Sequence, residues 1–326
     1  MVVGMDETNE QHDVVVVGGG AAGLSGALAL GRARRSVLVI DAGEQRNRPA
    51  SGVHGLLARE GMAPGELVAL GRAEVEGYGG TVLDGRVAEL AGSEGAFAVT
   101  LEDGRAFSAR RLLVTTGLVD ELPDVEGLRE LWGTDVLHCP YCHGYEVRDQ
   151  PIGVLSTGPR ALHLAQLFRQ LSADVTLFLH TGPRPSPEEL EALAARGIAV
   201  VDGEVAALET EAGRLRGVRL ATGEVVPRRA LAVETTLVAR AELLAGIGLE
   251  TTPLNLGIGE RIEADATGRT AVPGVWVAGN VSEPMAWVAG AASAGMLAGA
   301  AINNDLVAED TRVAVERASA GRVAAA

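Results

Sequence analysis

A glycine-rich turn between a buried strand and a helix constrains this chain more than any other feature of its sequence. Residues 13–17 read DVVVV, an apolar run typical of a parallel strand, and an Ala/Leu-rich helical segment follows. A second apolar strand over residues 36–40 ends at Asp41. Between the first strand and the helix lies a G-x-G-x-x-G pattern formed by Gly18, Gly20 and Gly23. These offsets predict a dinucleotide-binding βαβ unit, with a pyrophosphate at the helix N-terminus and Asp41 on a ribose.

The same strand, helix and strand pattern recurs further along the chain, over residues 152–155, 161–171 and 175–179. The turn of this second copy reads STGPRA and keeps one glycine. Pro159 has no N–H to offer a phosphate, and Ser156 lacks the backbone freedom of glycine. The pattern therefore predicts a second nucleotide-binding fold whose ligand is in doubt.

The remaining apolar segments predict how the two units are connected. Strand-like pieces cover residues 81–87, 97–101, 111–117 and 275–280, and a small-residue helix is expected over 285–303. We expect an α/β protein with two Rossmann-like domains of three-layer ββα architecture. Residues 1–120 and 241–326 would form the first domain, and residues 121–240 the second, inserted in the first. The last dozen residues are expected to be a frayed helix or a disordered tail.

Composition excludes several classes of function. All 28 basic residues are arginine, so Schiff-base lysine chemistry and a Walker A lysine are ruled out. The net charge of −15 argues against nucleic-acid and anionic-membrane partners. The N-terminal MVVGMDETNEQHD lacks the pattern of a signal peptide, and the apolar stretch 288–302 is shorter than the ~20 residues of a membrane span. We therefore expect a cytoplasmic protein that does not cross a membrane.

The only two cysteines lie in the segment HCPYCHGYE, at Cys139 and Cys142. C-x-x-C spacing is typical of dithiol/disulfide exchange, and the neighbouring His138 and His143 can lower a thiol pKa. C-x-x-C-H also matches c-type haem attachment, but that requires export. Zinc needs four ligands, and the two histidines adjoin the thiols too closely to complete a tetrahedron. Redox dithiol chemistry is the favoured interpretation, with haem and zinc as weaker alternatives.

Together these motifs resemble the low-molecular-weight thioredoxin reductase family. The similarity rests on the G-x-G-x-x-G unit, the TTG end of the strand at 111–117, a second unit just after the C-x-x-C, and VWVAGN before an Ala/Gly helix. It spans the chain from about Val14 to Asn303. The CPYCHGYE version is similar to FAD-dependent dithiol oxidases that close disulfides in natural products such as gliotoxin and romidepsin, and most of all to the bacterial holomycin-type (dithiolopyrrolone) enzymes.

The resemblance implies an FAD site. Its expected members are the pyrophosphate-binding Gly18, Gly19, Gly20, Ala22 and Gly23, the ribose-binding Asp41, the flavin-loop residues Gln45 and Asn47, the adenine contact Val87, and Thr116, Gly117, Gly279, Asn280 and Val288 along the rest of the cofactor. Asn280 departs from the acid that the family usually carries at that position, although an amide still bonds hydroxyl groups.

The departures at the second unit decide the direction of electron flow. Reductases of the family hold NADPH with an intact second glycine motif and an H-R-R-x-x-x-R segment, where this chain has STGPRA and His180-Thr-Gly-Pro-Arg184. Because the arginine pair for the 2′-phosphate is missing, NADPH binding is not expected. Electrons would then pass from a small-molecule dithiol to the enzyme and on to oxygen, giving hydrogen peroxide.

The resemblance also implies roles for the residues around the cysteines. Cys142 would lie against the flavin, and Cys139 would be attacked by the substrate thiolate. His143 stands where the family has a proton-shuttling aspartate, and His138 is the second candidate base; a packing role stays open for both. His54 is expected to be structural. Three apolar side chains are expected either to line the substrate pocket or to pack in the core, namely Tyr141, Met285 and Trp287.

Three functions remain open from the sequence. The first is the dithiol oxidase, the second is a thioredoxin reductase that uses NADPH or another donor, and the third is a non-catalytic redox sensor. The resemblance further implies a homodimer.

Overall fold

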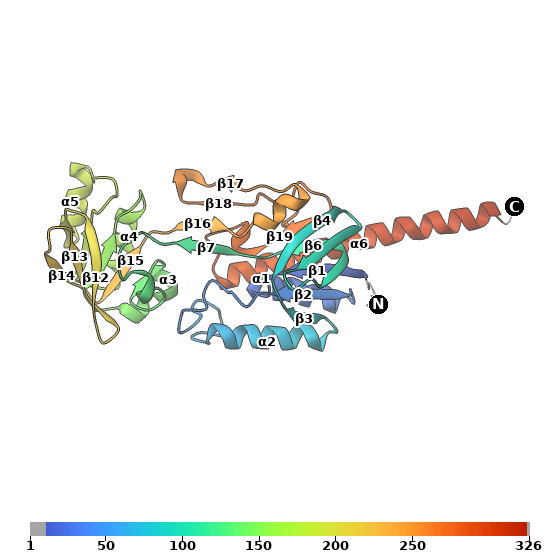
Figure 1. Ribbon diagram of the computed structural model, residues 1–326, viewed down its shortest axis with the longest axis horizontal. Coiled ribbons are helices and arrows are strands. Elements are labelled where there is room, and N and C mark those ends of the chain that lie inside the picture. The colour runs from blue at the N-terminus through green and yellow to red at the C-terminus, as the bar shows by residue number, and fades with distance from the viewer. Residues whose placement is uncertain (1–10, 325–326) are drawn as a thin grey trace, which may run out of the picture.

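The computed structural model describes residues 11–324 and has two lobes joined by a narrow waist (Figure 1). The first lobe contains a 7-stranded sheet in the order β3-β2-β1-β6-β5-β4, with β19 also paired to β6. Its strands are β1 (Gln11–Val17), β2 (Val37–Asp41), β3 (Thr81–Asp84), β4 (Val87–Ser93), β5 (Ala96–Leu101), β6 (Ala106–Val114) and β19 (Val275–Val277). Strands β3, β2, β1, β6 and β19 pair in parallel, whereas β4, β5 and β6 pair antiparallel.

Strand β1 explains why this lobe has three layers. Val14 and Val16 pack against the helices α1 (Ala21–Arg32) and α6 (Val288–Ala324), and Val15 and Val17 pack on the other face against β4 and β5. Alternate residues of a strand point to opposite faces, so a strand that is covered on both sides must be apolar throughout. The predicted three-layer ββα architecture is confirmed.

Helix α6 packs tightly on α1 through small residues. A side chain at Gly295 would overlap the carbonyl of Ala22, and one at Gly299 would lie 2.6 Å from the carbonyl oxygen of Gly26. The small-residue stretch that resembles a short membrane span is therefore a helix-packing face. Within residues 11–324, no helix combines the length and the apolar character that crossing a bilayer requires.

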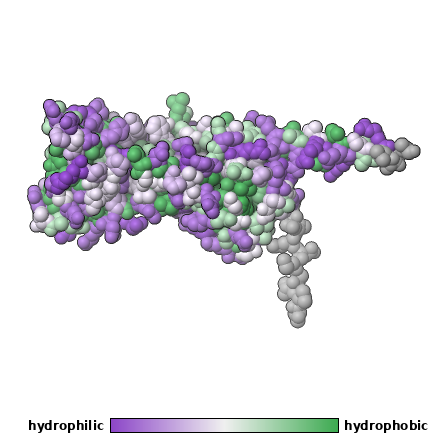
Figure 2. Space-filling view, turned by 90° about the horizontal axis from the view of Figure 1, so that it is seen from above, coloured by the Kyte–Doolittle hydropathy of each residue, from purple (hydrophilic) through white to green (hydrophobic). Residues whose placement is uncertain are grey.

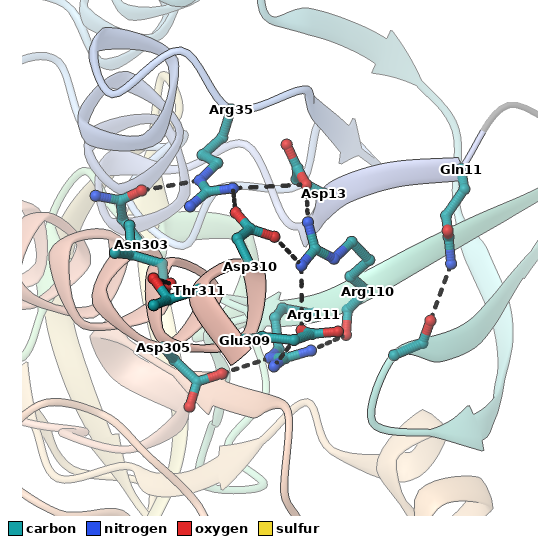
Figure 3. A network of polar contacts seen from close by, with 12 residues as sticks. Gln11, Asp13, Arg35, Arg110, Arg111, Asn303, Asp305, Glu309, Asp310 and Thr311 are labelled. Atoms are coloured by element: carbon teal, nitrogen blue, oxygen red, sulfur yellow. Dashed lines mark hydrogen bonds and ion pairs between the residues drawn. The ribbon is translucent and has the colours of Figure 1, made fainter. Parts of the chain in front are cut away.

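An ion-pair network holds the next part of α6 to the sheet (Figure 3). Arg111 of β6 is almost fully buried and pairs with Asp305 at 2.7 Å and Glu309 at 2.8 Å. Arg110 pairs with Asp310 at 2.6 Å, and Arg35 pairs with the same carboxylate at 2.7 Å. Beyond this network α6 projects from the lobe, and the surface in that direction is largely hydrophilic (Figure 2).

The observed limits of α6 correct the prediction of a helix over 285–303. The helix begins at Val288 and runs to Ala324, so the described part of the predicted tail is helical. The sequence pattern ended early because the apolar face that packs on α1 ends there, and charged side chains hold the following turns. The predicted absence of a signal peptide concerns mainly residues 1–10, which lie outside the described residues.

The second lobe is built on a 5-stranded sheet in the order β11-β10-β9-β15-β8, with a separate 3-stranded sheet, β12-β13-β14. Its strands are β8 (Val136–Leu137), β9 (Ile152–Leu155), β10 (Val175–Phe178), β11 (Ile198–Val201), β12 (Val205–Glu211), β13 (Arg214–Leu220), β14 (Val225–Pro227) and β15 (Ala230–Val233). Its helices are α3 (Pro140–His143), α4 (Ala161–Phe168) and α5 (Pro187–Ala195). Helix α4 ends at Phe168, before the predicted Leu171.

Two strands connect the lobes. Strands β7 (Leu118–Glu121) and β16 (Thr236–Ala239) pair antiparallel and form the waist in Figure 1. They lie close to the predicted domain boundaries at 120 and 241, which themselves stay predictions. Helix α2 (Pro64–Gly77) and strands β17 (Thr252–Pro253) and β18 (Glu260–Arg261) complete the first lobe. Short 3-10 helices occur at Arg129–Leu131, Tyr145–Val147, Glu242–Ile247, Asn255–Gly257 and Gly279–Val281.

Candidate active site

A single cavity of about 1250 Å³ runs from the glycine turn of the first lobe to the cysteine segment of the second. Ligand pockets usually measure about 300–1,000 Å³. The cavity is therefore large enough for an extended cofactor and a small substrate at the same time, and both lobes contribute to its walls.

The glycine turn is shaped to receive an anion. Gly18 has a φ of +108°, and a side chain there would meet the carbonyl of Thr115. Around Gly20 there is open space, since a Cβ atom built there has no neighbour within 4 Å. Helix α1 begins at Ala21, and no side chain of the described residues caps it. Its free first-turn N–H groups face a cradle that a pyrophosphate fits.

Gly23 has a different place from the other glycines. It does not line the cavity, and a side chain there would overlap the carbonyl of Gly18. This position fits close packing of helix α1 on strand β1, and the predicted contact of Gly23 with the cofactor stays a prediction. All the other predicted cofactor residues line the cavity: Gly18, Gly19, Gly20, Ala22, Asp41, Gln45, Asn47, Val87, Thr116, Gly117, Gly279, Asn280 and Val288.

Two of these residues also hold the walls of the cavity in place. The buried Asp41 carboxylate accepts hydrogen bonds from the backbone N–H groups of Gly19 and Gly43, both at 3.2 Å, and from the Gln45 amide at 3.1 Å. The Asn280 amide donates to the carbonyls of Glu283 and Ala286, at 3.1 and 2.9 Å. A carboxylate cannot donate such bonds, so asparagine here orders the turn that leads into α6.

The cysteine segment forms the opposite wall. Cys139 and Cys142 are joined by a disulfide at the start of α3, and both are partly exposed to the cavity. The Cys142 N–H donates to the Cys139 sulfur at 3.2 Å. Across the described residues, no three His, Cys, Asp or Glu side chains are grouped as a metal site requires. The arrangement is one in which a disulfide faces a cofactor-sized cavity.

His138 is held neutral by its surroundings. Its ring stacks on Trp132 at 5.6 Å between centroids, and its Nε2 lies 3.5 Å from an Arg46 nitrogen. Burial, followed by the nearby Arg46 charge, lowers the pKa of His138 from 6.5 to about 4. Burial opposes ionisation of Asp120, but two hydrogen bonds from Arg46, at 2.6 and 2.7 Å, outweigh it and lower the pKa of that carboxyl.

His143 lies at the end of α3, beside His54 and Glu146. Burial lowers its pKa below the usual value, although the Glu146 carboxylate acts in the opposite direction. His54 of the first lobe hydrogen-bonds Glu60 at 2.6 Å and lies 3.5 Å from Glu146 of the second lobe. His54 therefore connects the two lobes near the disulfide, which fits a structural role. The lowered pKa of His143 means that its ring is mainly neutral near pH 7.

Three exposed apolar side chains line the opening of the cavity near the disulfide. Tyr141 of α3 is 65% exposed and packs against Trp287 from the first lobe at 5.6 Å between ring centroids. Met285 is 59% exposed beside them. Of the two interpretations of these residues, a pocket wall fits this placement and core packing does not.

The two residues that remain of the family's NADPH segment, His180 and Arg184, bind other parts of the second lobe. Arg184 is exposed and pairs with Asp202 at 2.8 Å, and the His180 ring accepts the Val205 N–H at 3.0 Å. Neither residue lines the cavity. A 2′-phosphate would have to displace Asp202 from the one arginine that this segment offers.

Arg46 and Asp120 are among the residues of the cavity wall that the sequence analysis did not identify. In the sequence, Arg46 is a basic residue between the flavin-loop residues Gln45 and Asn47, and Asp120 is an acidic residue that follows the TTG strand end. Nothing in the local pattern indicates that they meet.

Comparison with known proteins supports the same fold. A family model described as pyridine nucleotide-disulphide oxidoreductase matches residues 12–295. Thioredoxin reductase tcpT of Claviceps purpurea (strain 20.1) is 31% identical over 93% of this chain and 96% of its own length. Thioredoxin reductase sirT of Leptosphaeria maculans is 29% identical over 91% and 95%.

Among solved structures, HlmI is 48% identical, with a TM-score of 0.87 over 95% of this chain and 96% of its own. The resemblance to thioredoxin reductases is thereby confirmed. A family model that spans most of the sequence, together with a cavity formed by an open glycine turn and a disulfide, shows that this chain belongs to the pyridine nucleotide-disulphide oxidoreductase family.

Proposed function

We propose that the protein is an FAD-dependent oxidase that closes an intramolecular disulfide in a small-molecule dithiol of the holomycin type, in the making of a natural product or in self-protection. The observation that carries this proposal is the Cys139–Cys142 disulfide, which faces the cofactor-sized cavity and lies beside an apolar opening. Similarity to HlmI and to the fungal relatives supports a disulfide oxidoreductase.

The residues of the first lobe fit FAD. The open cradle at Gly20 and the uncapped N-terminus of α1 would hold the pyrophosphate, and Asp41 would bond the ribose. The remaining cofactor residues would line the cavity toward the disulfide, with Val288 at the start of α6. Bound there, FAD would supply a two-electron acceptor for the cysteine pair, with oxygen as the proposed final acceptor.

The sulfur chemistry follows from the two cysteines. A substrate thiolate attacks the Cys139 sulfur, which breaks the Cys139–Cys142 bond and leaves Cys142 as a thiolate. The second substrate thiolate then attacks the sulfur of the substrate in this mixed disulfide and releases the Cys139 thiolate. The substrate has lost two electrons and two protons to the cysteine pair. Transfer of these two electrons and two protons from the cysteine pair to one O₂, which becomes one H₂O₂, restores the enzyme disulfide.

His143 is the stronger of the two candidate bases. Its lowered pKa leaves the ring neutral near pH 7 and able to accept a proton from the incoming dithiol. The Nε2 of His138 faces Arg46, and a pKa of about 4 makes that ring a weak base. We therefore assign the proton transfer to His143. His138 would instead position the segment before Cys139.

The test is turnover in air. Purified, FAD-loaded protein is mixed with a reduced dithiolopyrrolone or a model dithiol, and disulfide and peroxide are measured. We expect equal molar amounts of both, and absence of both would contradict the proposal. A single turnover without a second would instead favour a redox sensor.

A thioredoxin reductase is the second candidate, because the fungal relatives carry that name. Anaerobic addition of NADPH distinguishes the two, since a reductase would lose its flavin absorbance within seconds. From the resemblance alone, we also propose that the protein is a homodimer.

A further inference from the structure

The second nucleotide turn is filled by a side chain of the protein itself. Strand β15 runs parallel to β9, with Val233 opposite Leu155, so the next residue, Glu234, emerges beside the turn between β9 and α4. One carboxylate oxygen of Glu234 accepts the Gly158 N–H at 3.0 Å, and the other accepts the Arg160 N–H at 2.9 Å. The Glu234 side chain is only 7% exposed.

These contacts are those that a phosphate group makes in a nucleotide turn. Backbone N–H groups at the start of a helix bind anions, and α4 begins at Ala161 directly after the turn. Pro159 has no N–H, so the N–H groups on both sides of it are the ones that Glu234 takes. The Arg160 Nε lies 3.4 Å from the same carboxylate and adds a positive charge to its surroundings.

The two turns of this protein therefore differ in whether an anionic ligand can reach their backbone N–H groups. In the first lobe the Asp41 carboxylate accepts one N–H of the turn, that of Gly19, but the turn is open at Gly20 and no described side chain caps α1. In the second lobe a buried carboxylate lies where the anion would bind, and a bound phosphate would both lose these N–H groups and meet a like charge.

The loop after β10 closes the same turn from another side. The Gly182 N–H donates to the carbonyl of Ser156 at 2.9 Å, and a side chain at Gly182 would overlap the Ser156 hydroxyl. Ser156 is fully buried. The backbone of this turn is thus covered, whereas a nucleotide-binding turn has to be accessible.

We propose that Glu234 is an internal phosphate mimic that excludes nicotinamide nucleotides from the second lobe, and so determines that this protein takes electrons from a dithiol. This inference rests on the proposed oxidase function and names the residue behind its selectivity.

The test is nucleotide binding to FAD-loaded protein, in which the first turn is already occupied. Inorganic pyrophosphate and NADPH are titrated by calorimetry into the wild type, Glu234→Ala and Glu234→Gln. The matched control is Glu224→Ala, which removes an exposed glutamate of the same lobe. We expect Glu234→Ala to bind pyrophosphate at least tenfold more tightly than the wild type, Glu234→Gln to bind it more tightly to a smaller extent, and the control to be unchanged.

Circular dichroism and flavin content establish that each variant is folded. If the alanine variant does not fold, the glutamine variant, which keeps the size of the side chain, decides the question. Equal affinities in the wild type and a folded Glu234 variant would overturn the proposal, as would micromolar NADPH binding to the wild type. Because dithiol turnover is measured separately on the wild type, failure of one proposal is distinguishable from failure of the other.

Discussion

Acid should destabilise this protein through His138. The pKa of this histidine is 6.5 in ordinary surroundings and about 4 in the fold, where burial and Arg46 disfavour its charged form. Since the folded pKa lies below the unfolded one, stability from this group is fully present above pH 6.5 and is lost as the pH falls toward 4.

The size of the effect follows from the two pKa values. Between pH 7 and pH 5 the unfolded chain takes up most of one proton at this position and the folded protein takes up little. Integrating that difference gives a loss of about 2 kcal/mol in the free energy of unfolding, which reaches about 3 kcal/mol at pH 4 and below.

Urea unfolding followed by circular dichroism at pH 7 and pH 5 measures this loss. Other groups titrate in the same range, so the comparison is with His138→Phe, which keeps a ring to stack on Trp132 and cannot take up a proton. We expect the wild type to lose about 2 kcal/mol more than this variant. His163→Gln, which removes an exposed histidine on α4, is the control and should behave as the wild type. Equal losses in the wild type and His138→Phe would refute the reasoning.

Three further predictions concern the disulfide, the glycine turn and the anchor of α6. Cys139→Ser should keep its flavin but show no turnover with a dithiol, as measured by peroxide release. Gly20→Ala should fold normally, because the added methyl group meets open space, yet lose flavin occupancy in the visible spectrum, whereas wild-type occupancy would show that no cofactor approaches there. Arg111→Leu should lower the free energy of unfolding in urea by about 1.5–3 kcal/mol, since it removes the charged hydrogen bonds from a buried guanidinium to the partly buried carboxylates of Asp305 and Glu309. Arg184→Ala breaks an exposed pair and should cost about 0–1 kcal/mol, so equal costs for the two would contradict the anchoring role.

The fold was largely predictable because its signals are local. Val14 to Val17 and the glycines that follow specify a strand and a tight turn through the chemistry of adjacent residues, and C-x-x-C spacing alone places two thiols within bonding reach. The helix over 285–303 was predicted too short for the same reason. Its apolar pattern ends where α6 leaves α1, and the turns that follow are held by Arg110 of β6 and by Arg35, which lies between α1 and β2.

What the tertiary structure decided depends on residues that are far apart in the chain. Glu234 lies 76 residues from the N–H of Gly158, and its identity as an acid after a buried strand says nothing about the turn that it fills. His138 and Arg46 are 92 residues apart, and only their meeting makes the histidine a weak base. Sequence determines by itself those properties that arise between neighbours along the chain, namely the two nucleotide-type folds and the spacing of the cysteine pair. Whether a turn is open or filled, and whether a histidine is charged, is decided by burial and charge, which exist only once the distant segments have packed together.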